Sequence, residues 1–94
     1  MDFKLKNKHA LVCGSTAGIG KATAIALAAE GATITLLARN EEKLRATLAE
    51  LPVTEDQKHS YLVADFSNPE AVEETVKEHI KKNSTIHILI NNTG

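Results

Sequence analysis

The most constraining feature of this sequence is a glycine-rich segment between a short apolar run and an alanine-rich stretch. Gly14, Gly18 and Gly20 lie between the apolar run 10–13 and residues 21–30. Glycine allows a sharp turn at the first position, removes the side chain where an anion approaches the backbone at the second, and permits close helix packing at the third. The free N–H groups at the start of the helix would face that anion. The segment therefore predicts a phosphate-binding loop.

Three further residues belong to this predicted loop. Ser15 and Thr16 carry hydroxyl groups that can hydrogen-bond to phosphate oxygens, and Ile19 lies between the second and third glycines. Hydroxyl residues in such loops also serve turn geometry alone. The alternative interpretation of the whole segment is a glycine-rich turn that binds no ligand.

Strand-like and helix-like patterns alternate along the whole chain. The uncharged runs are typical of strands that are covered on both faces, and they lie at 10–13, 32–38, 61–64 and 86–90. Helical patterns separate them, which indicates a parallel sheet with right-handed crossovers. The sequence therefore predicts an α/β fold of one domain over residues 1–94, a Rossmann-like doubly wound sheet with strand order 3-2-1-4.

Local signals mark the ends of the second and third helices. Asn40 is a plausible N-cap for a helix over 41–51. Ser67 and Glu70 have the spacing of a capping box, with a proline between them that suits the first helical turn. The expected inward stripe of the third helix consists of Val72, Val76 and Ile80.

Composition narrows the possible partners. The 94 residues carry a formal net charge of −1, and the basic residues are scattered, so we expect no nucleic-acid partner. Cys13 is the single cysteine, and no apolar stretch resembles a signal peptide or membrane span. These features favour a soluble, cytoplasmic protein without membrane contact. The histidines lack metal-ligand spacing and are expected at the surface or at strand ends; they are His9, His59, His79 and His87.

The carboxyl ends of the predicted strands share one edge of the sheet, and the residues there carry a family resemblance. Asp65-Phe66 follows the third strand, and Asn91-Asn92-Thr93-Gly94 follows the fourth. With the wide spacing between Gly14 and Gly18, these segments resemble the N-terminal portion of classical short-chain dehydrogenases/reductases. The 3-oxoacyl-[acyl-carrier-protein] reductases are among the similar members. Thr93 stands where the family has alanine in Asn-Asn-Ala-Gly.

The resemblance implies a role for each of these residues in binding a dinucleotide. Asp65 would hydrogen-bond the adenine amino group, and the backbone N–H of Phe66 would contact the same ring. Asn92 would line the adenosine ribose and brace the central strands, beside Thr93 and Gly94. Asp65 could instead serve as a turn or cap residue, and Asn92 could be purely structural.

Arg39 bears on the choice of cofactor. Sites that take NAD usually end the second strand with an acidic residue, whereas an arginine accommodates the 2′-phosphate of NADP. Here the strand ends in Ala38-Arg39-Asn40, without a carboxylate. The sequence therefore predicts NADP(H) in preference to NAD(H). The alternative is that Arg39 is a solvated loop residue whose charge is tempered by Glu41 and Glu42.

The family's catalytic groups are not expected among these residues. By the resemblance, hydride transfer to or from a carbonyl or alcohol substrate uses a serine and a Tyr-x-x-x-Lys pair, all downstream of Asn-Asn-Ala-Gly. Tyr61 is followed four residues later by Asp65 rather than lysine. We therefore expect the full-length protein to be an NADP(H)-dependent oxidoreductase that forms a homo-oligomer. Residues 1–94 alone are expected to be inactive and to self-associate. The alternative is a non-catalytic nucleotide-binding or interaction module.

Overall fold

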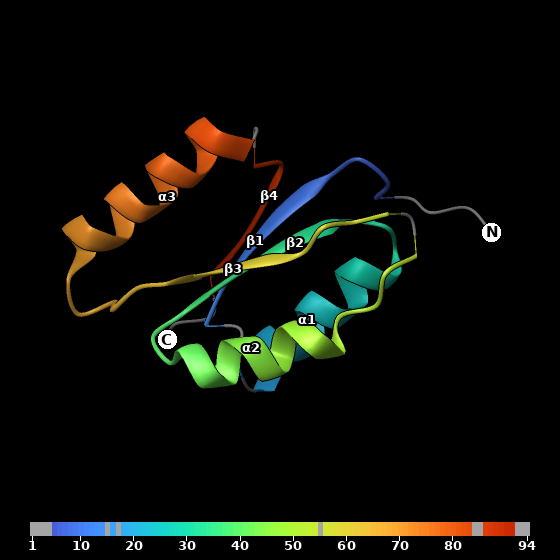
Figure 1. The fold of residues 1–94 in the computed structure, drawn as a ribbon, viewed down its shortest axis with the longest axis horizontal. Coiled ribbons are helices and arrows are strands. Elements are labelled where there is room, and N and C mark those ends of the chain that lie inside the picture. Colours follow the sequence, from blue (N-terminus) through green and yellow to red (C-terminus); the bar gives the residue numbers. More distant parts are fainter. Residues whose placement is uncertain (1–4, 15, 17, 55, 84–85, 92–94) are drawn as a thin grey trace.

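The protein forms a parallel four-stranded sheet with helices on both faces (Figure 1). The computed structural model describes residues 5–14, 16, 18–54, 56–83 and 86–91. The strand order β3-β2-β1-β4 is the predicted one, so the doubly wound α/β fold is confirmed. The elements are, in chain order, β1 (His9–Cys13), α1 (Gly18–Ala29), β2 (Thr33–Ala38), α2 (Glu41–Glu50), β3 (Ser60–Val63), α3 (Pro69–Asn83) and β4 (Ile88–Asn91).

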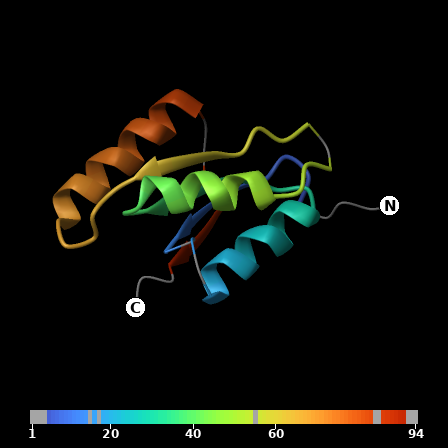
Figure 2. The ribbon, with the colours of Figure 1, turned by 60° about the horizontal axis from the view of Figure 1, so that its bottom comes forward.

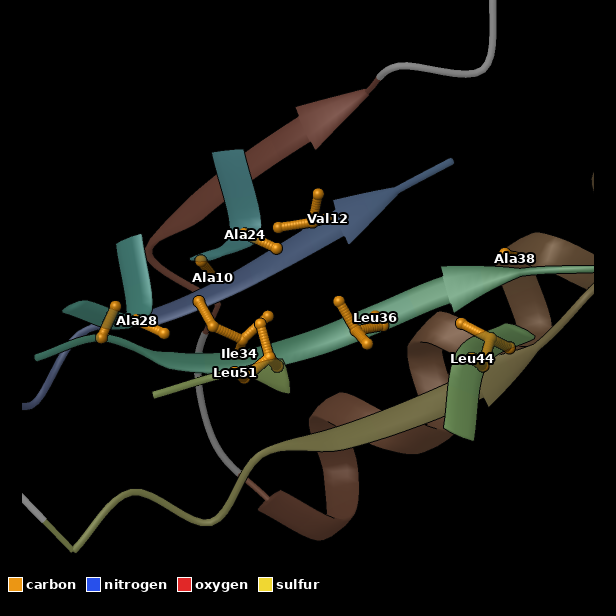
Figure 3. Packing of buried hydrophobic residues seen from close by; sticks show 10 residues of the cluster. Ala10, Val12, Ala24, Ala28, Ile34, Leu36, Ala38, Leu44 and Leu51 are labelled. Atoms are coloured by element: carbon orange, nitrogen blue, oxygen red, sulfur yellow. The ribbon is translucent and has the colours of Figure 1, made fainter. Parts of the chain in front are cut away.

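The two faces of the sheet are covered by different helices. Helices α1 and α2 lie side by side on one face, and α3 lies on the other (Figures 1 and 2). Side chains alternate along a strand, so Val12 packs towards the first face and Leu11 towards the second. Ala24 and Ala28 of α1 are fully buried over β1 and β2, where their small side chains bring the helix close to the sheet (Figure 3).

The helix ends follow the local sequence signals with one exception. The side-chain oxygen of Asn40 accepts a hydrogen bond from the backbone N–H of Lys43 at 3.1 Å, which confirms the predicted cap of α2. At the start of α3, the side chain of Asn68 accepts from the N–H of Ala71 at 3.3 Å. The predicted capping box of Ser67 is therefore wrong, because the N–H of Ser67 donates to Asp65 instead.

The inward face of α3 also differs from the prediction at one position. Val72 and Val76 pack against the sheet as expected, but Ile80 is 42% exposed and His79 is buried in its place. A helical period accommodates a third inward residue either three or four positions after Val76. Thr35 on the facing strand accounts for the choice, since its hydroxyl lies 3.0 Å from the His79 ring nitrogen.

Two of the four histidines are more buried than the sequence indicated, whereas His87 is exposed as predicted. His9 and His79 are only 8% and 7% exposed, so the expectation of a surface or strand-end position is wrong for His79, and His9 is a strand-end residue that is buried. His59 is half-buried and accepts from the N–H of Ile34 at 3.0 Å. Within the described part of the chain, no group of three or more histidine, cysteine, aspartate or glutamate side chains could hold a metal ion. No helix among the same residues is long and apolar enough to span a membrane.

Candidate dinucleotide-binding site

The carboxyl ends of the strands bring three predicted site segments together. The N–H of Gly14 donates to the carbonyl of Leu37 at 2.9 Å, which joins the end of β1 to β2. The N–H of Ala64 donates to the carbonyl of Ala38 at 3.0 Å, which joins the end of β3 to β2. Gly14, Arg39 and Asp65 therefore follow adjacent strands at one edge of the sheet, where doubly wound folds bind their ligands.

The glycine loop presents an open, backbone-lined surface at this edge. Gly14 and Gly18 have φ angles of 70° and 60°, in the left-handed region that favours glycine. A Cβ added at Gly18 would meet no atom within 4 Å, so space lies in front of the first turn of α1. Gly20 is buried within the helix, whereas the side chain of Ile19 is 75% exposed beside the loop. This geometry leaves room for a phosphate group against the N-terminus of α1.

Of the two hydroxyl residues predicted in the loop, only one is described by the structure. Thr16 is described and half-buried between Gly14 and Gly18. Ser15 lies outside the described residues, and so do Asn92, Thr93 and Gly94 at the end of the chain. The contributions predicted for these four residues stay predictions.

Asp65 builds a turn and also presents a charged group at the edge. Its side-chain oxygen accepts from the backbone N–H of Ser67 at 2.9 Å, and its carbonyl accepts from the N–H of Asn68 at 3.0 Å. The hydrogen bonds from the Ser67 backbone and hydroxyl lower the pKa of this exposed carboxyl, and the positive charge of Arg39 lowers it further. Asp65 thus has the turn role that was weighed as an alternative, and it stays ionised as a hydrogen-bond acceptor.

Arg39 is exposed at the end of β2, and the acidic residue nearest it in sequence is engaged elsewhere. The carboxylate of Glu41 accepts from the hydroxyl of Tyr61 at 2.9 Å and lies 3.7 Å from the guanidinium of Arg45. These contacts place the Glu41 carboxylate between Arg45 of α2 and Tyr61 of β3. They also give Tyr61 a structural role in joining α2 to β3.

Phe66 connects the site to an apolar cavity. It packs, half-buried, on the cluster that contains Leu11 and Leu37, below α3. The cavity there has a volume of about 380 Å³, and Leu89 of β4 is 64% exposed at its wall. Cys13 lines it as well, and burial raises the pKa of its thiol, which keeps the group neutral. This cavity was not predicted from the sequence, although the stripe of Val72 and Val76 indicated the face on which it lies.

Comparisons with known proteins agree with this geometry. Residues 8–94 match the family model described as short chain dehydrogenase. Hydroxysteroid dehydrogenase-like protein 1 of Gallus gallus is 41% identical over 97% of this chain, which spans 27% of that relative. Glucose 1-dehydrogenase of Gluconobacter oxydans is 36% identical over 97% of this chain, which spans 34% of that relative. The human relative, 38% identical over 98% of this chain, is named an inactive hydroxysteroid dehydrogenase-like protein 1.

Solved structures give the same result. L-Sorbose reductase from Gluconobacter frateurii, in complex with NADPH and L-sorbose, matches with a TM-score of 0.85 and 33% identity. The match covers the whole of this chain and 36% of the reductase. The present chain thus spans about a third of these proteins or less. The family match over residues 8–94, the strand order and the glycine loop together show that the chain belongs to the short-chain dehydrogenase family.

Proposed function

We propose that this chain is the dinucleotide-binding portion of an NADP(H)-dependent oxidoreductase that transfers hydride to or from a carbonyl or alcohol carbon. The observation that carries the proposal is the open glycine loop, with Arg39 exposed at the end of the neighbouring strand and no carboxylate at that position. The resemblance to 3-oxoacyl-[acyl-carrier-protein] reductases makes 3-oxoacyl thioesters the first substrate class to test.

The residues at the sheet edge fit the parts of the cofactor. The N–H groups at the start of α1 would bind the pyrophosphate, and the Arg39 guanidinium would hold the 2′-phosphate through two hydrogen bonds. The carboxylate of Asp65, which its own turn keeps ionised, would accept from the adenine amino group. The nicotinamide ring, when bound, supplies the hydride. The groups that would orient the substrate lie outside the described residues.

The preference for NADP(H) can be tested with a matched pair of arginine substitutions. Arg39→Gln removes the charged hydrogen bonds to the 2′-phosphate, which are worth about 1.5–3 kcal/mol. The dissociation constant for NADPH should therefore rise about 10- to 150-fold, while that for NADH stays unchanged. Arg45→Gln removes the same charge from exposed α2 and should leave both constants unchanged. An equal loss of both cofactors in Arg39→Gln would contradict the proposal.

A second candidate function is binding of the dinucleotide without turnover. It is favoured by the human relative, which is named an inactive protein. NADPH oxidation over a panel of ketones and 3-oxoacyl thioesters separates the two. Turnover of any substrate supports the enzyme. Tight NADPH binding without turnover, together with no Tyr-x-x-x-Lys in the reading frame beyond Gly94, supports the second candidate.

A further inference from the structure

The α3 face of the sheet changes from apolar to polar towards the amino ends of the strands. Leu11, Cys13 and Leu37 form its apolar half. Further towards the amino ends, His9 and Thr35 lie on the same face, and both are buried. The topology therefore gathers a polar cluster at the edge opposite the glycine loop, since all strands run parallel.

The hydroxyl of Thr35 is the centre of this cluster. It lies 2.6 Å from Nε2 of His9, 3.0 Å from Nε2 of His79 and 3.1 Å from the hydroxyl of Ser60. A hydroxyl has one proton and two lone pairs, so the Thr35 hydroxyl can donate one hydrogen bond and accept two. All three of its contacts are hydrogen bonds when one histidine ring accepts from Thr35 and the other ring and Ser60 donate to it. The two Nε2 atoms are themselves 3.5 Å apart, so protonating both rings brings two positive charges together.

A cavity of about 250 Å³ opens above the cluster. Lys8 and Lys58, which precede β1 and β3, line it together with Ser60. His9, His79 and His87 also line it, from β1, from α3 and from the segment before β4. None of the described lining residues is acidic. The charge that the described lining carries is therefore positive and comes from Lys8 and Lys58, and the cavity has room for a small tetrahedral anion or several water molecules.

We propose that this cavity binds a small oxyanion of the phosphate class, at the edge of the sheet opposite the dinucleotide loop. The ammonium groups of Lys8 and Lys58 supply the charge, and His87, whose Nδ1 accepts from the backbone N–H of His9, supplies its Nε2–H as a directional donor. Three segments remote in sequence contribute these groups, so the site depends on the fold.

Binding at this site is coupled to a proton. Burial lowers the pKa of His9, and the neighbouring His79 and His87 rings lower it further; burial also lowers the pKa of His79. An anion in the cavity offsets both effects, because it favours the charged form of a ring beside it. Anion entry is then accompanied by proton uptake from solvent at the His9–His79 pair. The affinity therefore rises as the pH falls from 8 to 6.

The test uses NMR of the histidine ring nitrogens, which locates the bound anion directly. Inorganic phosphate is titrated at low ionic strength, and sulfate is used for the pH dependence because its charge is constant from pH 6 to 8. Lys58→Glu reverses one charge of the cavity and should weaken binding about tenfold or more. Lys58→Gln should give a smaller loss. Lys81→Glu, on the exposed side of α3 beside Glu74 and Glu78, is the control of equal charge change and should leave the affinity unchanged.

The site is supported if phosphate shifts the NMR signals of the His9 and His79 ring nitrogens in a saturable way. Lys58→Glu should weaken this response, and Lys81→Glu should leave it unchanged. Phenyl phosphate then identifies the source of the ligand: tighter binding than inorganic phosphate indicates a phosphate ester, and equal binding indicates the free ion. Three results would overturn the proposal. The first is that neither phosphate nor sulfate shifts the ring signals, and the second is that Lys58→Glu and Lys81→Glu lose affinity equally. The third is that the affinity for sulfate does not depend on pH.

Discussion

Mild acid should destabilise this protein through the buried His9–His79 pair. Burial favours the neutral form of both rings in the folded state and lowers the pKa of each, and for His9 the neighbouring His79 and His87 rings lower it further. In the unfolded chain each ring titrates at its ordinary value of 6.5. The unfolded state therefore binds more protons than the folded state below this pH, and the free energy of unfolding falls as the pH falls.

Proton uptake by the unfolded chain sets an upper limit on the loss of stability. A histidine that stays neutral in the folded state costs about 1.4 kcal/mol of stability between pH 7.5 and 5.5, because its unfolded form takes up a proton over that range. The pair together can cost up to about 2.7 kcal/mol. This is a large part of the stability of a small domain, which is about 5–10 kcal/mol.

Urea unfolding at a series of pH values measures this loss, in buffers without phosphate or sulfate so that the proposed anion site stays empty. The matched variant carries His9→Val, Thr35→Val and His79→Leu, which replace the cluster by apolar groups of similar size. Its stability should change much less between pH 7.5 and 5.5, since His59 and His87 remain in both proteins. The prediction is refuted if the free energy of unfolding depends on pH equally in the two proteins. It is also refuted if NMR shows that the His9 and His79 rings of the folded protein titrate at or above pH 6.5.

Three further predictions follow from single contacts. Gly18→Asn should abolish dinucleotide binding in a folded protein, measured by NADPH fluorescence and circular dichroism, because asparagine tolerates the left-handed backbone but fills the open space at the loop. Gln57→Leu should lower the free energy of unfolding by about 1–3 kcal/mol, since its buried side-chain amide donates to the carbonyl of Ala28 at 2.9 Å. Leu89→Lys should reduce self-association, measured by light scattering, because Leu89 is 64% exposed on an edge strand; unchanged association would contradict this.

The sequence predicted the fold because each element carries its own local signal. The uncharged runs identified the four strands to within two residues, and the crossover rule was then enough to order them. Asn40 marked the start of α2 through its own side chain, and the alanine-rich stretch marked α1, whose Ala24 and Ala28 are fully buried against the sheet. The edge residues Gly14, Arg39 and Asp65 could be grouped for the same reason, since parallel strands end together.

The sequence analysis failed where a contact joins residues far apart in the chain. Thr35 and His79 are 44 positions apart, and His9 and His79 are 70 apart, so no local pattern relates them. Hydrophobicity favoured Ile80 for the inward position of α3, whereas the polar groups opposite selected the histidine one position earlier. At the start of the same helix, the bond of the Ser67 N–H to Asp65 competes with the predicted capping box, and Asn68 caps the helix instead.

The same topology explains why the two edges of the sheet carry different kinds of chemistry. Parallel pairing gathers the carboxyl ends of all strands at one edge, where the glycine loop and Asp65 must keep their positions for a dinucleotide to fit. It gathers the amino ends equally well, and the register places Thr35 opposite Ser60 at the other edge, beside His9. The two edges lie at opposite ends of the parallel strands, so the amino edge can acquire polar groups without altering the dinucleotide site. The buried cluster around Thr35 is tolerated by the fold because its members hydrogen-bond to one another, and three of them, His9, Ser60 and His79, also line the cavity at this edge.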